Sequence, residues 1–181
     1  MTTELADGAA TAPGAPTAPV VPATDDARLD AWRSFLHAHA RLTRRLDEEL
    51  QTAHHLSLAE YDALVQLAGS PGRRLRMSVL AERVLLSRSG LTRLVDRLEA
   101  ADMVRRSACA TDARGAEAIL TTTGVQRLRA ASQTHLAGVQ RYFLDVLDDD
   151  ERALIRRGLD RVIDELGCSP AVDPACATEE G

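Results

Sequence analysis

Apolar residues recur with the 3.6-residue period of an amphipathic α-helix along most of the chain. The first such stretch extends from 25 to about 53, which predicts a long helix with one apolar stripe. The members of that stripe are Leu29, Trp32, Leu36, Leu46 and Leu50. Ser57 and Glu60 have the spacing of a capping box, so a second helix is expected from there to about Gly69. A short third helix is expected near 78–84.

The segment from 87 to 120 has the order of parts of a helix-turn-helix followed by a wing. A helix over 87–101 is predicted from four apolar residues at helical spacing, Leu91, Leu94, Val95 and Leu98. Two short strands, 104–108 and 116–120, follow around a polar loop at 109–115, where Asp and Gly favour a turn. Such a helix suits the major groove of DNA, and such a hairpin suits the minor groove.

Two further helices are expected after the wing. Thr121 is placed to cap one of them, and Asp148 with Glu151 forms a capping pattern for a last helix that reaches about Leu166. The predicted fold class is mainly α with a small β-hairpin wing, in which N- and C-terminal helices form a dimerisation domain. A small winged domain cannot cover so many amphipathic helices, so we expect them to pack against a second copy.

These elements divide the chain into four regions. A disordered N-terminal tail is expected at 1–24, where Ala, Thr and Pro predominate, and a flexible C-terminal tail at 167–181. The helical dimerisation region comprises 25–55 and 121–166, and the winged helix-turn-helix DNA-binding domain occupies 56–120. A two-fold homodimer would bind a pseudo-palindromic double-stranded operator with half-sites about one helical turn apart.

The distribution of charge favours a nucleic-acid partner although the whole chain is acidic. The 181 residues have a formal net charge of −5. Between Arg73 and Arg114, however, ten arginines stand against five acidic residues, so this segment is cationic. A basic surface on an acidic body directs DNA to one face of a protein.

Nine residues of the predicted recognition helix and the wing are candidate DNA contacts. Helix arginines can read guanine edges, hydroxyls can reach bases or phosphates, and the helix N-terminus favours a phosphate. Arginines at the base of the wing suit phosphates, and one at its tip suits the minor groove. The candidates are Ser87, Arg88, Ser89, Thr92, Arg93, Arg97, Arg105, Arg106 and Arg114. The alternative for this arginine-rich face is an ordinary solvated surface.

Other classes of protein find little support in the sequence. It has no nucleophile elbow, glycine-rich phosphate loop, zinc motif or acid pair, so no enzyme activity, metal or cofactor is expected. No apolar run is long enough for a membrane span or a signal peptide. The three cysteines, Cys109, Cys168 and Cys176, lack metal-like spacing and suit a reducing cytoplasm.

Several motifs together resemble those of the MarR family of bacterial transcriptional regulators. They are Leu80-Ala81-Glu82-Arg83, the run from Leu91 to Glu99, Asp112-x-Arg114 and Leu120-Thr121-x-x-Gly124, and the similarity extends over about 29–166. The resemblance implies a dimeric winged helix-turn-helix regulator, more often a repressor than an activator, whose DNA affinity responds to a small aromatic or phenolic ligand or an oxidant. By matching position, 87–97 would be the recognition helix and Arg114 the wing-tip arginine.

Two positions depart from the pattern of the family. Many members have a second arginine directly after the wing aspartate, where this chain has Ala113, so wing binding would depend more on Arg114. Many also have glycine directly after the recognition helix, where a left-handed backbone is needed. Asp102 stands there in this chain, and Asp adopts that conformation less readily than Gly.

The signal that controls DNA binding has two candidates. In the family, ligands often bind in a crevice between the dimer helices and the DNA-binding lobe, and an aromatic wall with a cation suits an aromatic carboxylate. The candidate ligand residues are Trp32, His37, Arg41 and Tyr61. Ordinary core and surface roles are the alternative for these four.

Oxidation of Cys109 at the wing is the second candidate signal, because a new charge or crosslink there would disturb docking on DNA. A winged helix that binds protein rather than DNA is a further alternative. The salt dependence of binding would separate these two kinds of partner, because DNA binding through phosphates weakens steeply with added salt.

Overall fold

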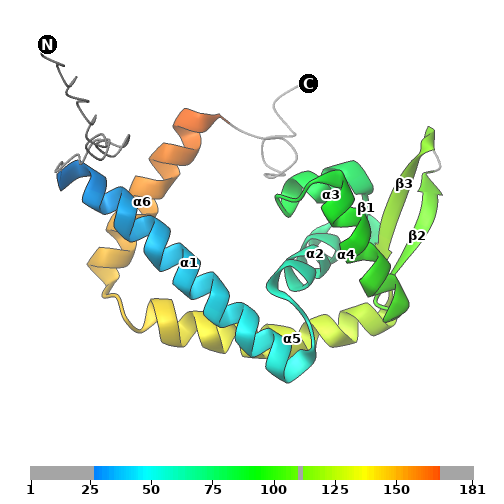
Figure 1. The fold of residues 1–181 in the computed structure, drawn as a ribbon, viewed down its shortest axis with the longest axis horizontal. Coiled ribbons are helices and arrows are strands. Elements are labelled where there is room, and N and C mark those ends of the chain that lie inside the picture. The colour runs from blue at the N-terminus through cyan, green and yellow to red at the C-terminus, as the bar shows by residue number, and fades with distance from the viewer. Residues whose placement is uncertain (1–26, 110–111, 168–181) are drawn as a thin grey trace, which may run out of the picture. The chain divides into compact units, whose positions relative to one another are not determined.

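The computed structural model describes residues 27–109 and 112–167. The tails predicted at 1–24 and 167–181 lie outside the described residues, apart from Gly167. The helices are α1 (Ala27–His54), α2 (Leu58–Gly69), η1 (Pro71–Arg73), α3 (Met77–Arg83), α4 (Arg88–Ala100), α5 (Thr122–Val139) and α6 (Asp149–Leu166). The strands are β1 (Arg74–Arg76), β2 (Val104–Cys109) and β3 (Asp112–Leu120) (Figure 1). The predicted fold class, mainly α with a small β wing, is confirmed.

The chain divides into two compact units, 1–36 and 37–181, with the boundary inside α1. Of the first unit the structure describes 27–36, the N-terminal turns of α1. Trp32 and Phe35 stack there with ring centroids 5.9 Å apart, and both rings are exposed. The second unit contains the rest of α1 and every other described element.

Side chains fix the start of α2. The hydroxyl of Ser57 accepts a hydrogen bond from the N–H of Glu60, and the carboxylate of Glu60 accepts one from the N–H of Ser57 at 2.9 Å, so the predicted capping box is present. Asp47 of α1 accepts a further bond from the N–H of Leu58 at 2.7 Å. These bonds satisfy N–H groups that a helix start leaves without partners, and they join α2 to the C-terminal half of α1.

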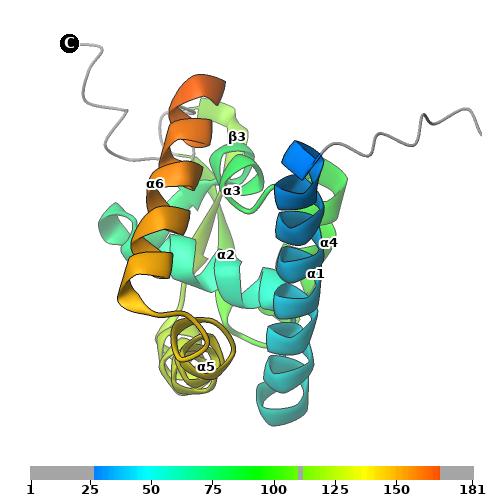
Figure 2. The same ribbon diagram turned by 90° about the vertical axis from the view of Figure 1, so that its left-hand side faces the viewer.

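The core of the second unit lies where α2, α3, α4 and the sheet meet, and α5 packs against α2 (Figure 2). Leu64 and Leu67 of α2 and Val104 of β2 belong to this core. The four residues predicted as the buried stripe of α4 are all buried: Leu91, Leu94, Val95 and Leu98. Each buried side chain of this size stabilises the fold by about 1.5–3 kcal/mol. Packing of the stripe holds α4 with its polar face outward.

The wing is part of a three-stranded antiparallel sheet with strand order β1-β3-β2. β1, which pairs with β3 along its whole length, was not predicted from the sequence. The loop predicted at 109–115 is wrong, because Cys109 pairs with Asp112 and only 110–111 stand between the strands. The register of the pairing shifts between Ala108 and Cys109. β3 is therefore longer than predicted, and it connects the wing to α5.

Three α-helices are followed by a left-handed residue that is not glycine: His55 after α1, Leu85 after α3 and Asp102 after α4. After α3, Leu85 has φ 54°, and the N–H groups of Leu85 and Leu86 donate to carbonyls in the last turn of the helix. After α4, Asp102 has φ 55° and the same pattern, which is the Schellman motif. A non-glycine residue in this conformation costs about 1–2 kcal/mol. The left-handed conformation expected at Asp102 is thus observed, and its carboxylate accepts a hydrogen bond from Thr123 at 3.0 Å.

The last two helices begin at their predicted caps. The hydroxyl of Thr121 accepts a bond from the N–H of Gly124 at 2.9 Å, and Asp148 forms a second capping box with Glu151. Between these helices α5 passes into a π-helical segment, η2 (Gln140–Leu144), which the sequence did not predict. The large apolar side chains of α6 are exposed in the single chain: Leu154, Ile155, Leu159, Val162, Ile163 and Leu166. The predicted apolar stripe exists, but the described part of the chain does not cover it.

Candidate nucleic-acid interface

The N-terminal half of α4 presents hydroxyl and guanidinium groups to solvent. Ser87 is the N-cap, and its hydroxyl accepts a hydrogen bond from the backbone N–H three residues later at 3.1 Å. Arg88 and Ser89 are exposed in the first turn, and Thr92 and Arg93 are exposed in the next. Among the side chains that the structure describes, no carboxylate lies within ion-pair distance of Arg88 or Arg93. These two cations are therefore available to an anionic partner.

Arg97 lies on the same helix but is held by the protein. Its Nε donates to Oε1 of Glu60 at 2.6 Å, while the other carboxylate oxygen of Glu60 accepts the capping-box bond from Ser57. Burial alone would raise the pKa of Glu60, but the bonds from Ser57 and Arg97 outweigh burial and lower this pKa. The pair joins the first turn of α2 to α4. Arg97 thus helps to position α4, and its contact with DNA stays a prediction.

Arg106 of β2 is held by even more bonds. Its guanidinium donates to Glu99 at 2.8 Å, to Asp96 at 2.6 Å and to the carbonyl of Thr92 at 3.0 Å. Its backbone N–H donates to the second carboxylate oxygen of Glu99 at 2.9 Å. The role of these two acids was not predicted, although their spacing of three residues places them on one helix face. Arg106 therefore braces the wing against α4.

Comparison with known proteins decides the family. A family model described as the MarR family matches 54–115 of the chain. AbsC, a MarR family transcriptional regulator from Streptomyces coelicolor, has a solved structure that is 34% identical, with a TM-score of 0.73. That match covers 81% of this chain and 98% of AbsC. The chain belongs to the MarR family.

Other solved MarR structures extend this comparison. Sco3205, a MarR family regulator from Streptomyces coelicolor crystallised in complex with DNA, is 36% identical with a TM-score of 0.73, and the match covers 80% of this chain and 94% of Sco3205. A mutant form of MarR from E. coli, crystallised with operator DNA, is 22% identical and has the same fold, with a TM-score of 0.65 over 77% of this chain and 99% of that one. No curated protein sequence matches the chain. As a MarR protein, the chain is a transcriptional regulator and not an enzyme.

Replacing Glu99 separates two roles of Arg106 in the MarR wing. If Arg106 is a brace, Glu99→Gln is expected to weaken operator binding by up to about tenfold, because the loss of a charge-assisted hydrogen bond worth about 1.5–3 kcal/mol loosens the wing, which must then be ordered when DNA binds. If Arg106 instead contacts a phosphate, the variant frees the cation and strengthens binding. Fluorescence anisotropy with a labelled operator measures the difference, and Glu82→Gln in α3 controls for the loss of one negative charge. Tighter binding by Glu99→Gln than by this control would refute the brace.

The structure describes the side chains at the base of the wing but not those near its tip. Arg105, at the base of β2, is exposed, and no carboxylate of the described residues lies within ion-pair distance of it. It is therefore available to a phosphate. The side chains of Arg114 and Cys109 lie outside the described part of the chain. The minor-groove contact of Arg114 and the redox role of Cys109 stay predictions.

The four candidate ligand residues do not share one environment. Trp32 belongs to the first unit and is 56% exposed, while His37 and Arg41 are exposed on the part of α1 in the second unit. Tyr61 is only 6% exposed, and its ring packs against His135 with centroids 4.5 Å apart. Tyr61 is therefore a core residue, which was the alternative to ligand binding. Modulation by an aromatic ligand stays a prediction.

Two of the described histidines, His54 and His135, lie against neighbouring parts of the fold. Nε2 of His54 is 2.7 Å from the hydroxyl of Thr134, and burial lowers the pKa of His135. Within 27–109 and 112–167, no three His, Cys, Asp or Glu side chains are grouped so that they could hold a metal ion. None of the helices in these ranges is both long and apolar enough to span a membrane.

Proposed function

We propose that this MarR protein is a repressor that binds a pseudo-palindromic DNA operator as a homodimer. The observation that carries the proposal is the exposed face of α4, where Arg88 and Arg93 have no carboxylate partner among the described residues, next to a β wing. The DNA complex of Sco3205, which is 36% identical, supports DNA as the partner. A dimer that covers an operator near a promoter competes with RNA polymerase for the same DNA, so we favour repression. A DNA partner also implies a cytoplasmic location.

Each element of the interface has a proposed role on the duplex. The N-terminal half of α4, from Ser87 to Arg93, enters the major groove, where arginine pairs with guanine and hydroxyls reach bases or phosphates. Arg105 contacts a phosphate beside the groove. Arg114 reaches the neighbouring minor groove.

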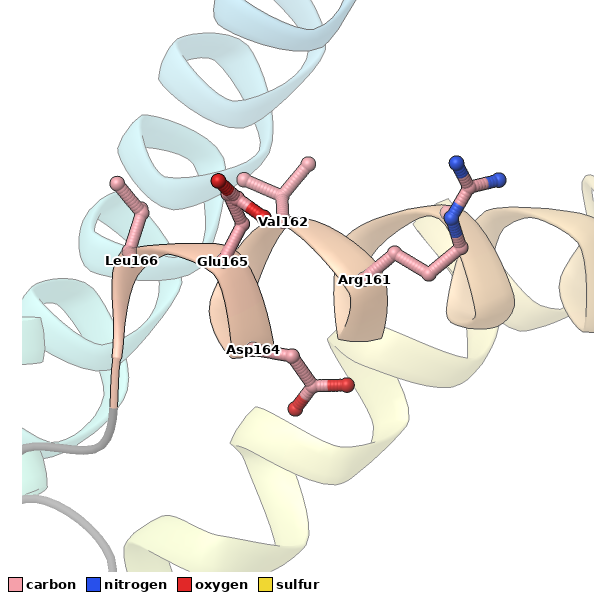
Figure 3. Close-up of a pocket in the computed structure, with 6 residues that line it drawn as sticks. Arg161, Val162, Asp164, Glu165 and Leu166 are labelled. Carbon is pink, nitrogen blue, oxygen red and sulfur yellow. The ribbon is translucent and has the colours of Figure 1, made fainter.

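A second copy of the chain is the proposed cover for α6. Single exposed apolar side chains are ordinary, but α6 carries six of them and contributes no buried residue to its own chain. Figure 3 shows Val162 and Leu166 projecting from the same side of α6, with Asp164 on the opposite side. We therefore assign 25–55 and 121–166 to the dimerisation region, 56–120 to DNA binding, and the tails to neither. Two copies place two recognition helices on successive major grooves.

Arg93→Ala is expected to weaken operator binding about 10- to 100-fold, because a bidentate contact with guanine is worth about 1–3 kcal/mol. The operator is first located by footprinting the DNA that flanks the coding region, and affinity is then measured at several salt concentrations. For the unaltered protein, the logarithm of the affinity should fall steeply and linearly with the logarithm of salt concentration.

Arg44→Ala is the matched control for this experiment. Arg44 is an exposed arginine of α1 that pairs with Glu48 at 2.9 Å, one helical turn away, and it lies outside the winged domain. Its loss should leave operator affinity within about twofold, since exposed ion pairs of this kind contribute little. Full operator affinity in Arg93→Ala, together with binding that is insensitive to salt, would favour a protein partner for this winged helix.

A further inference from the structure

Leu85 combines two features that the fold does not need. It has a left-handed backbone with φ 54°, and 85% of its surface is exposed. Its N–H donates to the carbonyl of Glu82 at 3.1 Å, and the N–H of Leu86 donates to the carbonyl of Ala81 at 2.9 Å. Glycine at position 85 would make the same backbone bonds without strain, because these bonds involve no side chain.

The packing contact of this helix end is made by the next residue. In a Schellman motif an apolar side chain usually packs back onto the helix from the position after the left-handed residue. That position is Leu86, which is partly buried against the core, so Leu85 adds nothing to the packing. An exposed leucine alone is common, and a left-handed aspartate alone is common. A leucine that is both exposed and strained calls for a role outside the folded chain.

The place of Leu85 in the chain indicates the partner. It stands two residues before Ser87, the N-cap of α4, so its Cα lies within about 7 Å of the start of the recognition helix. The N-terminal residues of a recognition helix are the ones that reach base edges in the major groove. The exposed Arg88, three residues after Leu85, attracts the phosphates of the duplex. The major groove presents one purely apolar group, the C5-methyl of thymine, and deoxyribose is the apolar part of the backbone.

We propose that Leu85 makes an apolar contact with operator DNA, either with a thymine methyl group or with a deoxyribose. The inference rests on the proposed DNA-binding function. The contact is made by the side chain alone, so its removal changes affinity for the operator without changing the number of phosphate contacts. The left-handed backbone of Leu85 lowers the stability of the folded protein, while its side chain contributes to DNA binding.

Leu85→Gly tests the proposal because it should move stability and binding in opposite directions. Relief of strain should raise the melting temperature by about 2–4 °C. Operator affinity should fall about tenfold, while the salt dependence of binding stays unchanged because no charge is lost. Leu85→Ala keeps the strained backbone but loses the side chain, so it should lose affinity without the gain in melting temperature.

His55→Gly is the matched control. His55 has the same left-handed backbone, with φ 54°, but follows α1 instead of α3. This variant should raise the melting temperature, as Leu85→Gly does, and should leave operator affinity unaltered.

Operators in which single thymines are replaced by uracil identify the group that Leu85 contacts. A replacement that weakens binding by the unaltered protein but not by Leu85→Gly marks a thymine methyl group. The absence of any such position marks deoxyribose.

Operator affinity equal to that of the unaltered protein in both Leu85→Gly and Leu85→Ala would overturn the inference while leaving the proposed function intact. Failure of the unaltered protein to bind any operator would overturn the proposed function first. The two failures are therefore distinguishable in one series of titrations.

Discussion

Leu159→Asp combined with Ile163→Asp is expected to convert the proposed homodimer to a monomer and to lower operator affinity more than about 100-fold. Both side chains are exposed on the apolar face of α6, so the single chain should fold without them. In a dimer the same positions would be buried, and carboxylates buried without partners cost several kcal/mol each. In a dimer, binding of one half-site raises the effective concentration of the second DNA-binding unit at the other half-site. Loss of this effect lowers affinity by about 10²–10⁴-fold.

Sedimentation velocity measures the oligomeric state, and anisotropy titration measures operator affinity. The control is Arg157→Asp, which introduces a carboxylate on the polar side of the same helix and should leave the dimer intact. Circular dichroism should report the same helix content for all three proteins. A double variant that still sediments as a dimer would exclude α6 from the dimer interface.

The recognition helix could be predicted from the sequence because all of its determinants are local. A serine cap, four apolar residues at helical spacing and the polar residues between them occur within fifteen positions, and each has the expected burial in the structure. The same holds for the capping boxes at Ser57 and Asp148. Helix caps and burial of one helix face both appear in the sequence, as capping residues and as apolar residues at a 3.6-residue period.

The sheet could not be predicted in full, because its pairing is set by residues distant in the chain. β1 is only Arg-Leu-Arg, too short to show a period, and it is a strand because it pairs with β3 more than 40 positions later. At the wing, Asp and Gly indicated a loop over 109–115, yet Cys109 already pairs with Asp112, so that only 110–111 separate the strands. Pairing with a distant strand thus decides β1, whereas the turn of the wing is local but shorter than its residues suggested.

The availability of the candidate DNA contacts could also not be predicted from the sequence alone. Sequence spacing places Arg93, Arg97 and Arg106 on one cationic surface, but it does not show which of them the protein itself neutralises. Glu60 lies 37 positions before Arg97, so that pair follows only from the tertiary fold. Spacing therefore predicts where cations gather, and the fold decides which of them are available to DNA.

Gly124→Ala is expected to destabilise the protein by about 3 kcal/mol, since a methyl group there has no room. A Cβ atom at this position would lie 2.1 Å from the backbone oxygen of Met103 and 2.7 Å from Cδ1 of Leu120. The oxygen cannot move away cheaply, because it also accepts hydrogen bonds from the N–H and the hydroxyl of Thr121, both at 3.1 Å. Urea denaturation should show the loss as a lower midpoint with an unchanged slope.

Gly69→Ala is the control for the added methyl group. Gly69 is the last residue of α2, and a Cβ atom there meets nothing within 4 Å, so this substitution should leave stability unchanged or raise it by up to about 1 kcal/mol. Equal denaturation midpoints for Gly124→Ala and the unaltered protein would mean that the start of α5 can shift away from Met103. Because Gly124 touches the first residues after α4, such a shift would also loosen the wing. Operator affinity should therefore fall with stability in Gly124→Ala and stay constant in Gly69→Ala.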